Sequence, residues 1–304
     1  MKNVKGVIII FLKGLLMGIC DIIPGISGGT IAFITGIYER LINGVKNYNP
    51  LSLYLLFKRF FNNKIKFKED FKKLDIIFFI PLILGIIIAF IIGSNILPKL
   101  LQNYFTQTIS FFSGLIISSS GLIYKEIKDH KIKDRIFGIV GLIIGIILAF
   151  LVPANIAPTY LFIFFSGILA IMAMFLPGIS GAFILLILGQ YEFMLNVVHN
   201  IRNNIKYFFS FIAGALIGVF VISKAISWLL KKYHAKTLYF LLGLVIGSLS
   251  IPLRNIYNHG IIVNPFNIFK LLIFIMLGVL IVYIFNKTAE RIYHKDFIGI
   301  KNKD

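Results

Sequence analysis

Apolar residues run along this chain in long stretches, and short polar segments between them carry most of the charge. A helix of about 20 apolar residues crosses the hydrocarbon core of a bilayer. Two regions, at about 5–45 and 158–198, are roughly twice that long. Six further runs suit a single crossing, at about 76–97, 105–123, 136–152, 207–230, 237–253 and 267–286. The pattern predicts an all-α polytopic membrane protein.

Both long regions are interrupted near the middle by the same sequence, PGISG, at 24–28 and 177–181. Proline lacks the N–H that a helix needs and disfavours helix in the residue before it, and glycine frees the backbone. Each arm beside the break has only about 17 residues, which is barely enough to cross a bilayer. We therefore predict two re-entrant helical hairpins, each with a PGISG tip inside the membrane.

Lysine and arginine are concentrated in some connecting segments and scarce in others. The positive-inside rule places the basic segments in the cytoplasm and the others outside, so both termini are cytoplasmic. Every segment obeys the rule only if each hairpin returns to the side from which it entered. The basic segments are 1–5, 46–75, 124–135, 231–236 and 287–304, and the external ones are near Pro98, 152–159 and 254–265.

The two hairpins are copies of one another. A shift of 153 residues aligns 24–47 with 177–200 without a gap, and about half of the positions are identical. Weaker matches follow, such as Gly85 with Gly214 and Gly114 with Gly243. The closest matches are Pro24/Pro177, Ser27/Ser180, Gly36/Gly189, Tyr38/Tyr191, Glu39/Glu192 and Asn43/Asn196.

Each half crosses the membrane an odd number of times, so the two halves have opposite orientations. This is the inverted repeat of secondary transporters, in which broken helices meet near the midplane. The predicted repeats are 1–155, with hairpin 5–45, the basic cytoplasmic segment 46–75 and three spans, and 156–290, with hairpin 158–198 and three spans. A basic cytoplasmic tail, 291–304, follows.

The amino-acid composition further restricts the class of protein and its partners. Hydrophobic residues make up 58% of the 304 and charged residues only 14%, which excludes an ordinary soluble domain. The net charge of +19 lies in loops facing anionic lipid, so nucleic acid is not an expected partner. A single cysteine, Cys20, excludes an internal disulfide. Lys13 interrupts the first apolar run and no cleavage site follows, so we expect the N-terminal segment to be retained.

The PGISG turns are the candidate binding site. Irregular backbone survives in lipid only where protein or water satisfies its polar groups, so the turns line a cavity or pack on each other. A half-helix that begins after such a turn offers N–H groups and a positive dipole end to an anion such as phosphate. The alternative is a helix breaker whose small residues allow tight packing. The predicted phosphate-binding residues are Pro24, Gly25, Ser27, Gly28, Gly29, Thr30, Pro177, Gly178, Ser180, Gly181, Arg40 and Lys224.

Asp21 precedes the first turn, where the second copy has Met174. A carboxylate at membrane depth marks a functional site by default, and the alternative is a side chain that caps the turn. The two turns are therefore not expected to be equivalent. Lys13 and Lys224 lie within apolar helices and either extend to lipid headgroups or reach the cavity.

Glu39 and Glu192, with Asp21, are candidate proton carriers for coupled transport. The two glutamates follow Gly28 and Gly181 by about 11 residues, which is roughly 16 Å along one continuous helix. They would then lie toward opposite membrane faces, and the alternative is that they are interfacial charges.

The sequence offers no catalytic apparatus. All five histidines fall in predicted loops, and no metalloprotease, nucleophile-elbow or phosphate-binding-loop motif is present. We therefore predict no enzymatic activity, no metal site and no cofactor.

The stretches DIIPGISGGTIAFITGIYERLI (21–42) and PGISGAFILLILGQYE (177–192) resemble the PopT polyprenyl-phosphate transporter family, and the resemblance extends over essentially the whole chain. It implies a multi-pass protein of the bacterial plasma membrane that returns undecaprenyl phosphate, a lipid carrier of cell-wall synthesis, from the outer to the inner leaflet. A polyprenyl phosphate lipid and the bilayer are then the partners. The residues themselves leave two alternatives, a transporter of small soluble anions and an intramembrane enzyme acting on a prenyl phosphate.

The charge pattern yields a direct test of topology. We expect cysteines introduced at Asn155 and Asn63 to react with an impermeant reagent from opposite sides of the membrane, because only the segment around Asn63 is basic. Labelling of both positions from the same side of intact cells would contradict the inverted repeat.

Overall fold

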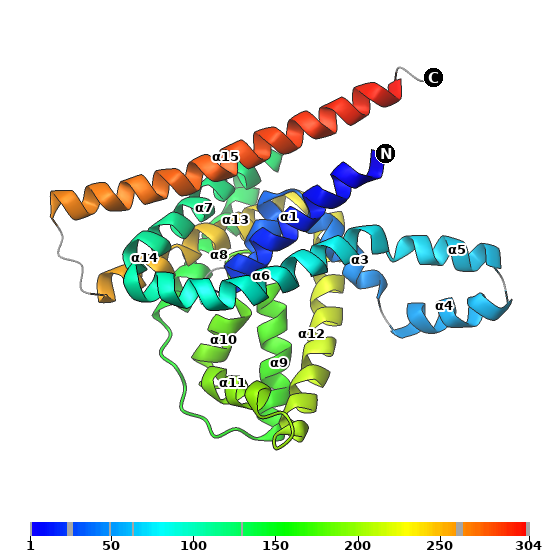
Figure 1. Ribbon diagram of the computed structural model, residues 1–304, viewed down its shortest axis with the longest axis horizontal. Coiled ribbons are helices and arrows are strands. Elements are labelled where there is room, and N and C mark those ends of the chain that lie inside the picture. Colours follow the sequence, from blue (N-terminus) through cyan, green and yellow to red (C-terminus); the bar gives the residue numbers. More distant parts are fainter. Residues whose placement is uncertain are drawn as a thin grey trace.

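The computed structural model describes residues 2–22, 27–48, 50–62, 64–128, 130–259 and 264–301, and every regular element in these residues is an α-helix (Figure 1). The start of α1 and the end of α15 lie on the same side of the molecule. The helices are α1 (Lys2–Ile22), α2 (Gly28–Ile34), α3 (Tyr38–Asn47), α4 (Pro50–Asn62), α5 (Lys64–Lys73), α6 (Ile76–Asn103), α7 (Phe105–Glu126), α8 (Ile132–Phe150), α9 (Tyr160–Met174), α10 (Gly181–Ile187), α11 (Tyr191–His199), α12 (Ile205–Lys232), α13 (His234–Ser248), α14 (Ser250–Asn258) and α15 (Pro265–Lys301).

The prediction of a helical membrane protein is confirmed. By length and composition, four of the described helical segments can cross a bilayer, and the bent pair α10–α11 makes a fifth if it counts as one span. Helices also form over the predicted spans 105–123 and 136–152, but α7 and α8 are not among the four. α8 has three charged residues near its start, and α7 contains five serines. The four segments are Asp70–Gly93, Ile205–Lys232, His234–Asn258 and Pro265–Ile284.

Helices at corresponding places in the two halves pack in the same way. α1 packs along α6, and α9 packs along α12. The remaining long helices pack against helices of the other half. α7 packs against α15, and α8 packs against α13. The two halves are therefore interleaved.

Glycines allow the backbones to approach closely at these crossings. A Cβ atom on Gly85 of α6 would collide with the carbonyl oxygen of Phe11 on α1, and one on Gly214 of α12 would collide with that of Phe164 on α9. Gly114 and Gly243 play the same part where α7 meets α15 and where α13 meets α8. Small residues at such crossings are typical of membrane helices. The weak glycine matches in the sequence thus mark equivalent helix contacts.

Each hairpin contains a second break that the sequence analysis did not predict. Gly36 and Gly189 both adopt a φ of +67°, and the residue after each donates its N–H to the carbonyl five residues earlier. This left-handed glycine ends α2 and α10 after seven residues each. α11 leaves α10 at 114°, so the expected continuous helix from Gly181 to Glu192 was wrong. Glu39 likewise lies on the separate helix α3.

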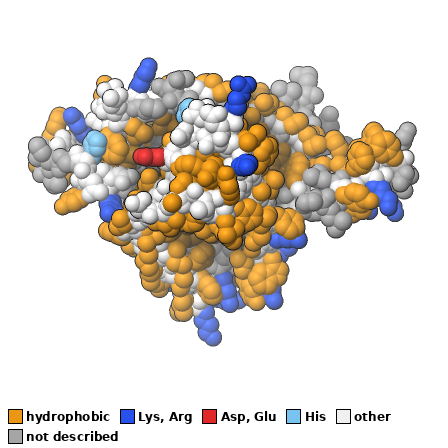
Figure 2. Space-filling model, turned by 90° about the horizontal axis from the view of Figure 1, so that it is seen from below, with side chains coloured by type: hydrophobic (Ala, Val, Ile, Leu, Met, Phe, Trp, Pro, Cys, Tyr) orange, Lys and Arg blue, Asp and Glu red, His pale blue; other side chains and the backbone are white. Residues whose placement is uncertain are grey.

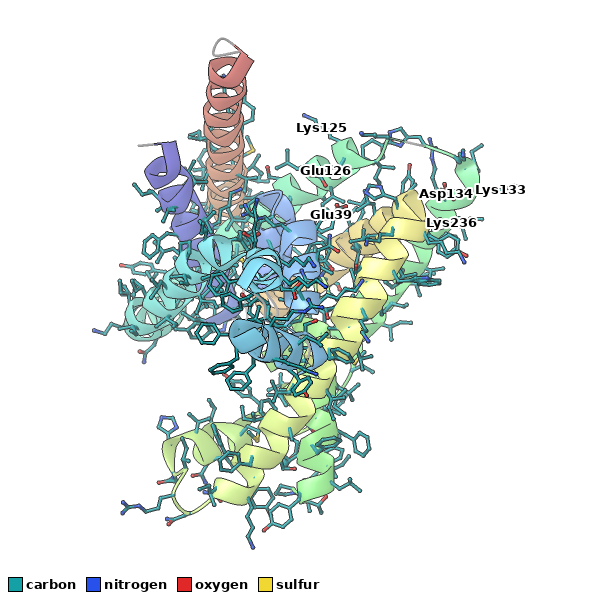
Figure 3. All side chains as sticks on the ribbon, turned by 90° about the vertical axis from the view of Figure 1, so that its right-hand side faces the viewer. Glu39, Lys125, Glu126, Lys133, Asp134 and Lys236 are labelled. Atoms are coloured by element: carbon teal, nitrogen blue, oxygen red, sulfur yellow. The ribbon has the colours of Figure 1, made fainter. Side chains whose placement is uncertain are left out.

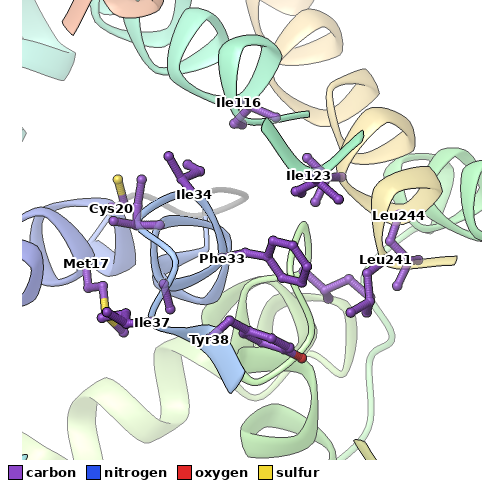
Figure 4. Packing of buried hydrophobic residues seen from close by; sticks show 14 of the residues in the cluster. Met17, Cys20, Phe33, Ile34, Ile37, Tyr38, Ile116, Ile123, Leu241 and Leu244 are labelled. Carbon is purple, nitrogen blue, oxygen red and sulfur yellow. The ribbon is translucent and has the colours of Figure 1, made fainter. Parts of the chain in front are cut away.

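The first hairpin lies deeper in the core than the second. All seven residues of α2 are buried, whereas only Phe183 of α10 is buried. Phe33 and Tyr38 lie close to Leu241 and Leu244 of α13 (Figure 4). Helix α2, which follows the first turn, is thus held on several sides by other helices.

We expect Gly85→Ala and Gly214→Ala to destabilise the protein, because an added methyl group overpacks a crossing at a cost of about 1–3 kcal/mol. Gly121→Ala in α7 is the control, since a Cβ there meets nothing within 4 Å. The midpoint of thermal unfolding in detergent is the measurement. If both crossing variants match the control, the helix contacts described above are wrong.

Candidate functional site

Helices α2 and α3 of the first hairpin pack directly on the turn of the second hairpin. The backbone N–H of Gly178 in the second turn donates to the Thr30 hydroxyl at 2.8 Å, and the Tyr38 hydroxyl donates to the Phe175 carbonyl at 2.9 Å. The missing side chain of Gly29 leaves room for the carbonyl of Met174. Side chains of the first hairpin therefore satisfy irregular backbone of the second, as lipid surroundings require.

Asp21 closes the first turn. Its Oδ1 atom accepts the backbone N–H of Gly28 at 2.7 Å, and a Cβ on Gly28 would collide with this carboxylate. The N–H that we predicted for phosphate is therefore occupied by an acid of the same chain, which agrees with the capping alternative. Asp21 Oδ2 and Ser27 Oγ are buried and have no hydrogen-bond partner among the described residues. Pro24 and Gly25 lie outside the described residues.

The second turn has the same serine but no acid. Pro177 and Ser180 are buried, and Met174 stands where the first copy has Asp21. Gly178 has a φ of +89° and lies against the backbone of α13. Gly181 begins α10 and packs on the carbonyl of Ala170. This turn thus lacks the carboxylate that caps the first.

The predicted cationic partners contact other parts of the protein. Arg40 forms two hydrogen bonds with the Asp75 carboxylate, at 2.6 and 2.9 Å, and its guanidinium lies over the ring of Phe78. Lys224 is exposed on α12, and its ammonium lies 4.0 Å from the ring centre of Phe220. These contacts do not bring Arg40 or Lys224 to a turn.

Lys13 of α1 contacts the end of α2 within the first hairpin. Its side chain is buried, and Nζ donates to the carbonyl of Thr35 at 2.5 Å. Thr35 ends α2, where the helix dipole favours a positive charge. Lys13 therefore points inward, and the alternative that it extends to headgroups does not hold.

Glu39 lies in an exposed charged cluster at one end of the molecule. His234, which begins α13 rather than lying in a predicted loop, bonds to Glu39 Oε1 at 3.0 Å. Glu126 and Lys125 of α7 and Lys236 of α13 lie in the same region (Figure 3). Partial burial raises the pKa of the Glu126 carboxyl above its usual value, and the nearby Glu39 adds to the increase.

Glu192 is also exposed, on α11 of the second hairpin. Of the three candidate proton carriers, only Asp21 therefore lies in the interior. The described residues contain no group of three or more His, Cys, Asp or Glu side chains that could hold a metal ion.

An apolar groove of about 400 Å³ extends from residues that flank the two turns to the outer surface. Gly29 lines it from the first hairpin, and Met174 and Phe175 line it from the second. Ile83 forms part of the wall and is 48% exposed on the outer face of α6. The other lining residues are Met17, Tyr38, Leu41, Val45, Tyr48, Phe79, Leu82, Ile86 and Val219.

A second apolar groove, of about 590 Å³, lies between α1, α6, α7 and α15. Leu15 and Ile19 of α1 line it, and Gln107 and Thr108 supply polar groups. It does not include any residue of the described turns. Both grooves arise from packing between distant segments, so the sequence carried no signal for them.

Comparison with known proteins gives the family. The profile of the undecaprenyl phosphate translocase-like family matches residues 17–264, which include both turns. A polyprenyl-phosphate transporter of Vibrio cholerae serotype O1 is 38% identical over 239 residues, covering 79% of this chain and 75% of that protein. A polyprenyl-phosphate transporter of Staphylococcus aureus is 31% identical over 255 residues, covering 78% and 83%. No solved structure matches the chain. The chain belongs to the undecaprenyl phosphate translocase-like family.

Proposed function

We propose that this protein is a flippase that carries undecaprenyl phosphate from the outer to the inner leaflet of the bacterial plasma membrane, where it supports peptidoglycan synthesis and cell-wall biogenesis. The observation that carries the proposal is the apolar groove that extends from residues flanking the two turns to the exposed face of α6. A lipid needs a pathway that opens sideways to the bilayer, and a soluble anion needs one that is sealed from it. The groove suits the lipid, and the two related transporters are named for such a substrate.

In the proposed complex, part of the prenyl chain lies in the groove and the phosphate lies beside the turns. The Ser27 and Ser180 hydroxyls are the donors we assign to the phosphate, because both are buried beside a turn. Ser27 Oγ in addition has no partner among the described residues. Hydrogen bonds to a charged group stabilise it by about 1.5–3 kcal/mol each. The rest of the prenyl chain stays in the bilayer.

We further propose that the two halves form an inverted repeat with both termini in the cytoplasm. The matching helix pairs, with matching glycines at their crossings, support a repeat that extends beyond the aligned hairpins. The start of α1 and the end of α15 lie on one side, which is compatible with this topology (Figure 1). Relative movement of the halves would then expose the site to each leaflet in turn.

Inward transport of an anion requires a source of free energy. Moving one negative charge against an inside-negative potential costs about 2.3 kcal/mol per 100 mV. Co-transport of protons offsets this cost, and Asp21 is the carboxylate we assign to it. Asp21 is half-buried, but its Oδ2 atom is buried and has no partner in the described part of the chain. Protonation would weaken its bond to Gly28 and open that N–H to the substrate.

Two other functions fit less well. A transporter of small soluble anions would not need the apolar groove at its site. An intramembrane enzyme acting on a prenyl phosphate would need a base paired with its nucleophile, and the Ser27 hydroxyl has no hydrogen-bond partner among the described residues. The groove argues against the soluble anion, and the missing base beside Ser27 argues against the enzyme.

The groove gives a paired test of the function. We expect Ile86→Trp to slow the movement of undecaprenyl phosphate in reconstituted vesicles by at least about tenfold, because the larger ring fills space needed by the prenyl chain. Ile87→Trp is the matched control, since Ile87 is 47% exposed on the same helix and does not line the groove. Equal transport by the two variants would show that the groove is not the pathway.

Asp21→Asn should leave transport measurable but independent of an imposed pH gradient, because the amide cannot carry a proton. Glu39→Gln and Glu192→Gln should retain the gradient dependence, since both glutamates are exposed. The measurement is the rate of undecaprenyl phosphate movement with and without the gradient. Gradient dependence that persists in the Asp21 variant would eliminate Asp21 as the carrier.

A further inference from the structure

Helices α4 and α5 form a hairpin that projects from the side of the molecule (Figure 1). Asn47 donates to the Lys73 carbonyl at 2.9 Å, and the Tyr48 hydroxyl donates to the Leu74 carbonyl at 2.7 Å. Arg59 of α4 pairs with Asp70 of α5, which holds the two helices together. The projection is therefore braced both internally and at its root.

One face of α4 carries exposed aromatic rings. Tyr54, Phe57 and Phe61 follow one another at spacings of three and four residues, which places them on one side of the helix. They are 60, 67 and 69% exposed, and the rings of Phe57 and Phe61 touch edge to face. Phe60 and Phe71 are also exposed and extend the surface toward α5.

Positive charge accompanies these rings. Residues 50–73 contain seven Lys or Arg and two acidic residues, a net charge of +5. Lys58 and Lys72 are exposed, and hydrophobic and basic side chains lie next to each other on the hairpin at the right of Figure 2. An exposed aromatic surface of this kind marks a contact with a partner or a membrane. Basic residues beside the aromatic surface favour a negatively charged partner or membrane.

We propose that the α4–α5 hairpin binds the surface of the cytoplasmic leaflet, with its aromatic rings at headgroup depth and its lysines on anionic phosphates. Helices that lie in the membrane interface carry Trp, Phe or Leu on the face that enters the lipid and Lys or Arg on the polar face. Tyr48, at the root of the hairpin, also lines the apolar groove, so the bound headgroups lie beside the groove. The hairpin thus gathers phosphate lipids where the transported lipid leaves. The cytoplasmic side rests on the proposed topology, and only this last step depends on the proposed transport.

The test uses the full-length protein in vesicles. Phe57→Trp is made together with Trp228→Phe, because Trp228 is the single tryptophan of the chain. We expect brominated phosphatidylglycerol to quench the fluorescence of the new tryptophan strongly, and aqueous acrylamide to quench it weakly. Phe61→Trp serves as a second probe if the first variant does not fold.

Charge is tested separately. Lys58→Gln and Lys72→Gln should each lower the equilibrium constant for membrane binding of the hairpin roughly fivefold, since one lysine near an anionic surface contributes about that factor. Lys125→Gln and Lys128→Gln are the controls, because both residues are exposed on another basic segment. Neutral phosphatidylcholine vesicles should give a larger loss than either single variant, because they remove the attraction of all the basic residues at once.

Three results would overturn the proposal. Strong acrylamide quenching without lipid quenching would place the rings in water. Quenching that changes as the protein is diluted among vesicles would mean that a second copy covers them. Lipid quenching that is equally strong in anionic and neutral vesicles would show that anionic headgroups are not what the hairpin binds. All three are independent of transport, so they remain informative if the proposed function fails.

Discussion

The contact of α2 and α3 in the first hairpin with the turn of the second hairpin is the interaction on which the rest of the structure depends. Inside a bilayer no water is available to a broken backbone, and each unsatisfied polar group costs several kcal/mol. The Thr30 hydroxyl accepts from Gly178, and Tyr38 donates to Phe175, so the first hairpin provides partners for the second. Both hairpins must therefore lie side by side. The apolar groove follows from this arrangement, because its walls include residues of both.

The two turns share their sequence but differ in charge. Asp21 caps Gly28 in the first turn, and Met174 replaces it in the second. Thr30, which bonds to the second turn, is likewise replaced by Phe183. The two turns therefore do not form a symmetrical pair of phosphate sites. One turn holds a carboxylate that competes with an anion, and the other does not. This difference gives the coupling proposal its physical basis.

The sequence predicted the breaks in the helices better than the shape of the site. Proline and glycine in PGISG forced the first break in each hairpin. Gly36 and Gly189 were visible as identical residues, but a glycine in an apolar run fits a continuous helix as well as a left-handed turn. The second break, and the displacement of Glu39 and Glu192 that follows from it, could not be read from the chain.

The contacts that the charged side chains make also could not be predicted from the sequence. Arg40 pairs with Asp75, which is 35 positions away, and Lys13 points to the end of α2. Neither contact follows from local spacing, because each depends on how helices cross. The matches of Gly85 with Gly214 and of Gly114 with Gly243 were the exception. Those helix crossings have no room for a larger side chain, so glycine occurs at the corresponding position of both halves.

The central claim is that this protein moves a lipid phosphate between leaflets. Its most direct test is a leaflet assay in vesicles that contain the purified protein and undecaprenyl phosphate labelled on one leaflet. The account predicts that the protein accelerates the exchange of the labelled lipid between leaflets far above the rate in empty vesicles, without comparable uptake of inorganic phosphate. Uptake of inorganic phosphate with no acceleration of the lipid would contradict it.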